Sequence, residues 1–188
     1  VSPHMLDQGW SFDRASGSSG DDLYESAFMH QLYTRVQPDY TGRVTVPVLW
    51  DKQQQTIVSN ESAEIIRMFN SAFDELTGNT LDYWPAAKRV EIEQLNEWIY
   101  NDINNGVYRA GFATTQAAYE HNVTAVFDGL ERVETILAHK RYLSGDSLTE
   151  ADLRSFPTLI RFDANHHSLF QYTLIQLRPR VPFRDYIL

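Results

Sequence analysis

The 188-residue chain contains no cysteine, so these residues can form no disulfide and supply no thiol nucleophile. Basic residues are also scarce, because 16 Lys and Arg stand against 25 Asp and Glu and leave a formal net charge of -9. A surface with this charge repels phosphate backbones over most of its area. We therefore expect no nucleic-acid partner.

Long apolar runs are missing as well. No run approaches the roughly 20 residues that span a bilayer, and residues 1–8 carry neither the charged nor the apolar region of a signal peptide. The expectation is a protein with no membrane segment and a cytoplasmic location. The start at Val1 further suggests a fragment or an unusual start.

The remaining composition is that of an ordinary soluble protein. Hydrophobic residues make up 43% and charged residues 22% of the sequence, as in typical globular domains. The length is sufficient for a real core and suits one domain, or a small domain fused to a larger one.

Residues 44–69 are the most informative segment. They are typical of a hairpin from Val44 to Val58, broken by Pro47, and a helix that opens on Asn60-Glu61-Ser62. Because Pro47 lacks an N–H, the chain should bend there and leave the backbone of Val46 free to pair with a ligand. Ser62 falls in the first helical turn, where unpaired N–H groups favour an anion. The segment therefore predicts a cradle for a small peptide that carries a carboxylate.

Apolar spacing predicts the other elements. In the first part of the chain we expect a short helix at 23–36 and a second one at 61–76, which Thr77-Gly78-Asn79 ends. After a linker through Trp84-Pro85, the pattern becomes helical throughout, first at 86–104 and then beyond the cap Thr115 to Leu137. The fold class is thus α+β and mostly α, with one domain at 1–78 and an all-helical one at 86–188.

The segment at Thr149 predicts a strongly specified helix start. Thr149 as N-cap places Asp152 at the third helical position, where its carboxylate can reach back to the N–H of the cap. We interpret both residues as structural. After Asp163 the helical pattern is lost, and Pro179 and Pro182 exclude a long helix.

A strand-and-helix domain followed by an all-helical domain is the order found in glutathione transferases. The sequence closely resembles one branch, the glutathionyl-hydroquinone reductases, also called Xi-class or omega-like transferases. A Val-Pro followed by Glu-Ser occurs across thioredoxin-like glutathione binders, while Trp10 and Asn104-Asn105-Gly106-Val107-Tyr108 point to this branch. The matching segments cover roughly residues 1–163 and are 5–12, 43–51, 59–69, 98–112 and 142–163.

This resemblance implies a partial thioredoxin-like domain, an incomplete helical transferase domain and a possible homodimer. Glutathione would be the co-substrate, and no metal is implied. Val46, before a proline that is cis in these folds, would pair its backbone with the cysteinyl part of glutathione. Glu61 and Ser62 would hold the γ-glutamyl end, and Trp10 and Arg43 would complete the site. Tyr108 would face the hydroquinone, whose oxygen its phenolic O–H can hydrogen-bond.

The resemblance also implies a thiol mechanism. A cysteine attacks the thioether sulfur of a glutathionyl-hydroquinone, the hydroquinone leaves, and a second glutathione resolves the mixed disulfide. In the family this cysteine belongs to a Cys-Pro-Trp segment upstream of the residue that matches Val1. We therefore expect a chain truncated at both ends, with the glutathione cradle retained and negligible reductase activity. The alternatives are a non-catalytic glutathione-binding or helical interaction module, and an incomplete gene product.

Each predicted site residue also has a plainer interpretation. Glu61 and Ser62 could merely start a helix, Trp10 could be a packing residue, and Tyr108 a loop aromatic. The adjacent pair His166-His167 near Asp163 lacks a third well-spaced ligand, so we predict no metal site there. Tyr172 and Tyr186 are not assigned to the hydroquinone site, because residues 164–188 follow the family pattern poorly.

Overall fold

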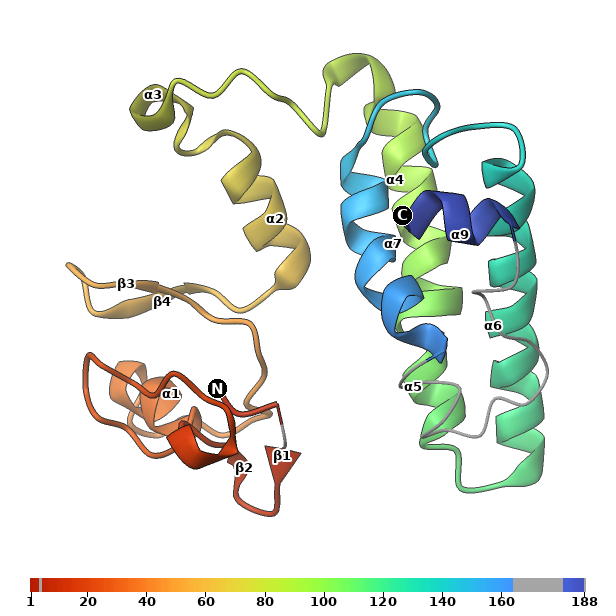
Figure 1. Cartoon of the computed structure of the whole chain (residues 1–188). Helices are drawn as coiled ribbons and strands as arrows, with labels where there is room; N and C mark the ends of the chain where they lie inside the picture. Colours follow the sequence, from red (N-terminus) through yellow and green to blue (C-terminus); the bar gives the residue numbers. More distant parts are fainter. Residues whose placement is uncertain (4, 164–180, 188) are drawn as a thin grey trace. The chain divides into compact units, whose positions relative to one another are not determined.

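The computed structural model describes residues 1–3, 5–163 and 181–187, and they divide into two compact units, Val1–Ile66 and Arg67–Leu188. Short strands and short helical segments form the first unit, and helices form the second (Figure 1). The α+β, mostly α class expected from the sequence is confirmed. The predicted domain limits, 1–78 and 86–188, stay predictions.

The first unit contains two antiparallel hairpins, the 3-10 turn η1 (Arg14–Ser16), one helix and the first residues of a second helix. Strands β1 (Met5–Leu6) and β2 (Gly9–Trp10) form one hairpin, and β3 (Leu49–Asp51) and β4 (Thr56–Ser59) form the other. Helix α1 (His30–Val36) places Leu32 and Tyr33 in a small core with Met29. The predicted hairpin is therefore present, but its strands are shorter than the expected span from 44 to 58.

The helix expected at 23–36 begins only at His30. Asp21 explains the difference, because its carboxylate accepts the N–H groups of Leu23, Tyr24 and Ser26 at 3.0–3.3 Å and holds a turn in place of a helix. Glu25 then adopts a φ of 52°, which no α-helix allows. The apolar spacing could not reveal this competing set of side-chain hydrogen bonds.

Helices dominate the rest of the chain. The predicted helix at 61–76 divides into α2 (Ser62–Ser71) and α3 (Asp74–Thr77), and α3 ends at Gly78 in the left-handed conformation, as Thr77-Gly78-Asn79 predicted. The predicted helix at 86–104 is continuous but changes type. The remaining elements are η2 (Ala86–Lys88), α4 (Arg89–Trp98), the π-helical η3 (Ile99–Asn104), α5 (Gly106–Gly111), α6 (Gln116–Leu137), α7 (Glu150–Arg161) and α9 (Val181–Ile187).

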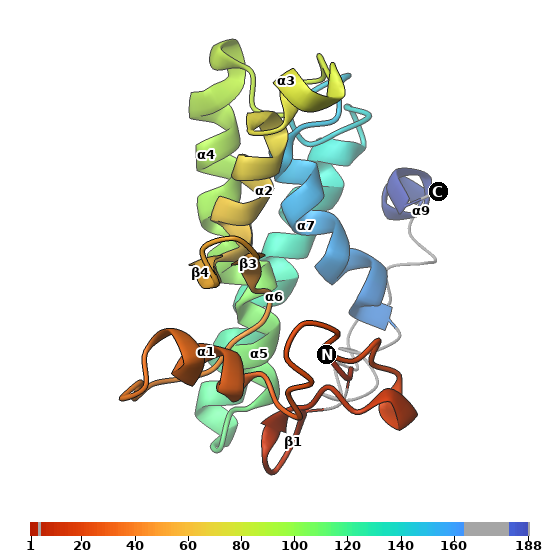
Figure 2. The same cartoon turned by 90° about the vertical axis from the view of Figure 1, so that its left-hand side faces the viewer.

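The core of the second unit lies between α4, α5, α6 and α7. Helices α4, α6 and α7 run side by side in Figures 1 and 2, and α5 follows α4 end to end. Helix α6 matches its prediction, and the hydroxyl of Thr115 caps it by accepting the N–H of Ala118 at 3.3 Å. Gly129 lets α6 approach η3 closely, since a Cβ there would lie 3.0 Å from Ile103 Cγ1. Within the described ranges, no helix is long and apolar enough to cross a membrane.

Thr149 and Asp152 have the structural roles predicted for them. A capping box is present at the start of α7, where Asp152 Oδ2 accepts the N–H of Thr149 at 2.9 Å and its hydroxyl at 3.0 Å. The other oxygen of Asp152 accepts the N–H of Leu143 and the hydroxyl of Tyr186. Burial, and then the charge of Asp152, raises the pKa of Tyr186. Tyr186 and Phe183 of α9 thus belong to the core, which the sequence pattern did not indicate.

Candidate functional site

The loop before β3 presents the first part of the predicted cradle. The Val46–Pro47 peptide bond is cis, as the family resemblance implied. Val46 is half-buried against the core of the first unit, and its N–H and C=O make no hydrogen bond in the described ranges. The backbone of Val46 is therefore available to pair with an extended peptide.

The start of α2 presents the second part. The hydroxyl of the buried Ser59 accepts the N–H of Glu61 at 3.1 Å and donates to Glu64 at 2.9 Å, which fixes where the helix begins. The side chains of Glu61 and Ser62 are exposed and make no hydrogen bond to another described residue. The N–H of Ser62 is likewise unpaired within this part of the chain. This helix start can accept an anion beside a free carboxylate.

A tyrosine joins these two segments, and no sequence motif indicated it. The hydroxyl of Tyr33 donates to the carbonyl of Thr45 at 2.9 Å and accepts the amide of Asn60 at 3.1 Å. Asn60 also donates to Oγ1 of Thr45 at 3.1 Å. Thr45 precedes Val46 and Asn60 precedes Glu61, so three side chains link the two segments in which a binding site is predicted.

Trp10 and Arg43 lie on the same unit. Trp10 ends β2, its carbonyl accepts the N–H of Met29 at 2.8 Å, and its ring packs against the small core that contains Tyr33. Arg43 is exposed, its carbonyl accepts the hydroxyl of Tyr40 at 2.9 Å, and its guanidinium forms no ion pair with the described residues. Trp10 therefore also packs in the core, as its plainer interpretation had it, while the guanidinium of Arg43 can bind a carboxylate.

Tyr108 belongs to α5 in the second unit. The residue is 50% exposed, and its ring lies nearly parallel to that of Phe112, with the centroids 6.4 Å apart. The tyrosine is thus a helix residue, not the loop aromatic of the plainer interpretation. Phe112 is 71% exposed, and the two rings form an aromatic surface that the sequence motifs did not indicate.

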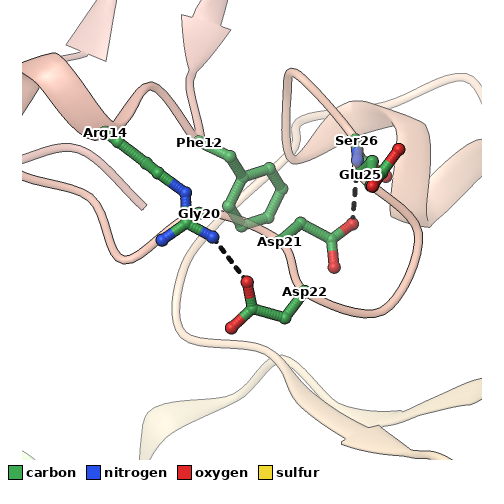
Figure 3. A pocket seen from close by; sticks show the side chains of 7 residues that line it. All are labelled: Phe12, Arg14, Gly20, Asp21, Asp22, Glu25 and Ser26. Atoms are coloured by element: carbon green, nitrogen blue, oxygen red, sulfur yellow. Dashed lines mark hydrogen bonds and ion pairs between the residues drawn. The ribbon is translucent and has the colours of Figure 1, made fainter.

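A separate cavity of about 360 Å³ lies on the first unit (Figure 3). Its lining includes the Arg14–Asp22 ion pair, the ring of Phe12 and the carboxylate of Asp21. Burial opposes ionisation of Asp21, but hydrogen bonds from Ser26 and the neighbouring N–H groups outweigh it and lower the pKa of this carboxyl. None of the predicted glutathione-binding residues lines this cavity.

No group of three or more His, Asp or Glu side chains suited to a metal ion occurs among the residues that the structure describes. The pair His166-His167 and Tyr172 lie outside these residues. The prediction that this pair holds no metal therefore stays a prediction.

Comparison with known proteins identifies the family that this chain resembles. Residues 116–184 match the family described as glutathione S-transferase, C-terminal domain. The chain is 58% identical over 164 residues to the glutathionyl-hydroquinone reductase YqjG of Escherichia coli, covering 87% of this chain and 50% of that protein. It is 48% identical over 174 residues to the glutathionyl-hydroquinone reductase PcpF of Sphingobium chlorophenolicum, covering 93% and 56%. The chain thus spans about half the length of these relatives.

Two solved structures superpose closely on this chain. The glutathione-bound structure of Escherichia coli YqjG superposes with a TM-score of 0.96 at 51% identity, covering all of this chain and 61% of the other. The Xi transferase of Phanerochaete chrysosporium superposes with a TM-score of 0.96 at 44% identity, covering all of this chain and 65% of the other.

The fold is therefore that of a glutathione transferase, in which part of a thioredoxin-like domain precedes a helical domain. The chain is a homologue of the glutathionyl-hydroquinone reductases, the Xi class of these transferases, as the sequence motifs indicated.

Proposed function

We propose that this chain carries the glutathione-binding segments of a glutathionyl-hydroquinone reductase. The observation that carries the proposal is the pair of unpaired groups described above: the backbone of Val46 beside Pro47, and the exposed start of α2 at Glu61 and Ser62. Glutathione-bound YqjG is among the structures that this chain resembles.

The chemistry of glutathione suits these groups. Its γ-glutamyl end carries an ammonium and a carboxylate side by side, and Glu61 and Ser62 offer a carboxylate and a hydroxyl with an N–H at adjacent positions. The cysteinyl residue of glutathione has one backbone N–H and one backbone C=O, which are complementary to the N–H and C=O of Val46. Arg43 can pair with a carboxylate of the ligand, and the ring of Trp10 offers an apolar surface on the same unit.

In the proposed reaction a cysteine thiolate attacks the sulfur of a glutathionyl-hydroquinone. The carbon–sulfur bond breaks, the ring carbon takes a proton, and the cysteine and glutathione form a mixed disulfide. A second glutathione then forms oxidised glutathione and releases the thiol. None of the 188 residues is a cysteine, so this step would need a thiol from outside them.

Tyr108 is the proposed contact for the hydroquinone. Its half-exposed phenol can exchange a hydrogen bond with a hydroquinone oxygen, and the nearly parallel ring of Phe112 extends the aromatic surface. A hydroquinone-type substrate, a homodimer and a cytoplasmic location are predictions that rest on the resemblance.

Calorimetric and thermal-shift titrations of the 188-residue chain with glutathione test the proposal. At about a hundred times its Kd, glutathione should stabilise the fold by about 2.7 kcal/mol. Glu61→Ala and Ser62→Ala should each weaken binding, since each removes a group that faces the γ-glutamyl end. Ser71→Ala, an exposed serine at the other end of α2, is the matched control and should bind as the unchanged chain does.

The absence of any shift at millimolar glutathione would count against the proposal. It would favour the alternative of a helical interaction module, in which the second unit serves as a scaffold. Equal losses with Ser62→Ala and Ser71→Ala would show that binding occurs elsewhere.

A further inference from the structure

The buried hydroxyl of Tyr33 has its full set of hydrogen-bond partners. Tyr33 is only 4% exposed, although its partners lie 12 and 27 residues further along the chain. The hydroxyl donates to the carbonyl of Thr45 and accepts two groups, the N–H of Thr45 at 3.4 Å and the amide of Asn60. A phenol has one donor and two acceptor positions, so none is left over for a ligand.

These bonds end at residues next to the proposed binding groups. Both main-chain groups of Thr45 contact the phenol, which fixes the peptide that leads into Val46. Asn60 spans the gap with two bonds of 3.1 Å, one to Tyr33 and one to Thr45, and leads directly into Glu61. The ring of Tyr33 is itself fixed, because it packs against Tyr40 with the centroids 5.1 Å apart.

We propose that Tyr33 is a positioning residue which, through Thr45 and Asn60, holds the backbone of Val46 and the Glu61–Ser62 helix start at the separation that one glutathione spans. This inference rests on the proposed function. It concerns geometry, since none of the three side chains needs to touch the ligand. Two binding groups that a single ligand joins act together only if their spacing is set in advance.

Affinity for glutathione in the 188-residue chain provides the test. Tyr33→Phe removes only the hydroxyl and should raise the Kd about tenfold, because the two segments lose their shared anchor. Asn60→Ala should give a similar loss. Since Asn60 is exposed, its truncation leaves the core intact. The control is Tyr24→Phe, because the hydroxyl of Tyr24 makes no hydrogen bond in the described ranges and its ring contact with Trp50 is kept.

A double-mutant cycle with Ser62→Ala distinguishes positioning from general support of the fold. Once the Ser62 contact is gone, the separation of the two binding segments matters less. Tyr33→Phe should therefore raise the Kd for glutathione by at most about twofold in the Ser62→Ala background. Simple loss of stability would instead give about the same fold-change in both backgrounds.

Three results would overturn the inference. The first is a Kd within twofold of the unchanged chain for both Tyr33→Phe and Asn60→Ala, and the second is a double variant whose loss equals the product of the single losses. Both would leave the proposed function standing. The third is an unchanged chain that binds no glutathione, which overturns the proposed function and this inference with it.

Discussion

Arg67 and Glu150, 83 residues apart in the sequence, form a two-pronged ion pair in the second unit. The guanidinium donates to both carboxylate oxygens, from Nε to Oε2 at 2.9 Å and from Nη2 to Oε1 at 2.7 Å. The side chain of Glu150 is only 2% exposed, and Asn96 and Arg154 provide further donors at 3.2 and 3.4 Å. Arg67 also lies over the ring of Trp84. Three side chains thus donate hydrogen bonds to one buried carboxylate.

Arg67→Met should destabilise the second unit by about 2–3 kcal/mol, because it leaves a buried carboxylate with two weaker donors. The loss should be below that of a fully buried pair, since the side chain of Arg67 is 35% exposed. The check is the free energy of unfolding in urea. Arg67→Met combined with Glu150→Leu should recover part of the loss.

The pair Arg14–Asp22 is the matched control, because its side chains are 65% and 80% exposed. Arg14→Met should change the free energy of unfolding by less than about 1 kcal/mol. If Arg14→Met and Arg67→Met lowered the free energy of unfolding by similar amounts, burial would not be what makes the Arg67–Glu150 pair important for stability.

Asp152→Ala should destabilise the fold by about 3 kcal/mol or more. It removes the acceptor for the N–H groups of Thr149 and Leu143 and for two hydroxyls, all of them in a buried setting. Tyr186→Phe should cost about 1 kcal/mol, because Asp152 keeps its other donors. Urea unfolding measures both. Asp146→Ala, at an exposed position with no hydrogen bond in the described ranges, should be close to neutral.

Asp82 should make stability depend on pH in the acid range. Hydrogen bonds from Asn70 and from the N–H of Trp84, at 2.8 and 2.9 Å, lower the pKa of this carboxyl below its ordinary 3.8. A lowered folded-state pKa stabilises the fold above the ordinary value, and this stabilisation is lost as pH falls through the folded-state pKa. An NMR titration of Asp82 should therefore give a midpoint below 3.8.

Asp82→Asn should flatten the fall in the free energy of unfolding below about pH 4, because it removes the titrating group. Glu75→Gln is the control, since Glu75 is exposed and makes no hydrogen bond in the described ranges. If the free energy of unfolding falls equally steeply below about pH 4 in both variants, groups other than Asp82 cause the fall.

Local patterns in the sequence predicted those parts of the fold that short-range interactions determine. The steps of three and four from Tyr119 to Leu137 gave α6, and the spacing from Thr149 to Asp152 gave the capping box, because each interaction joins residues within one or two turns. The cis bond at Val46–Pro47 came from the family resemblance instead.

The sequence could not reveal contacts between distant residues. No motif in the sequence distinguishes Tyr33, and only folding brings its hydroxyl to Thr45 and Asn60. The π-helical turn at Ile99–Asn104 also has a distant partner, since Asn104 donates to the carbonyl of Arg154 and the hydroxyl of Thr158 in α7. Such partners are set by packing, which no local pattern records.

The purified 188-residue chain should not accelerate the thiol-dependent release of hydroquinone from a glutathionyl-hydroquinone. Catalysis of that step needs a protein thiolate of low pKa, whereas the chain has no cysteine and free thiols are mostly protonated at neutral pH. Chromatographic measurement of free hydroquinone, with and without the chain, checks this. YqjG of Escherichia coli, named as a reductase of this type, is the positive control. Turnover by the chain well above the protein-free rate would show that its residues catalyse the reaction by a route that needs no cysteine.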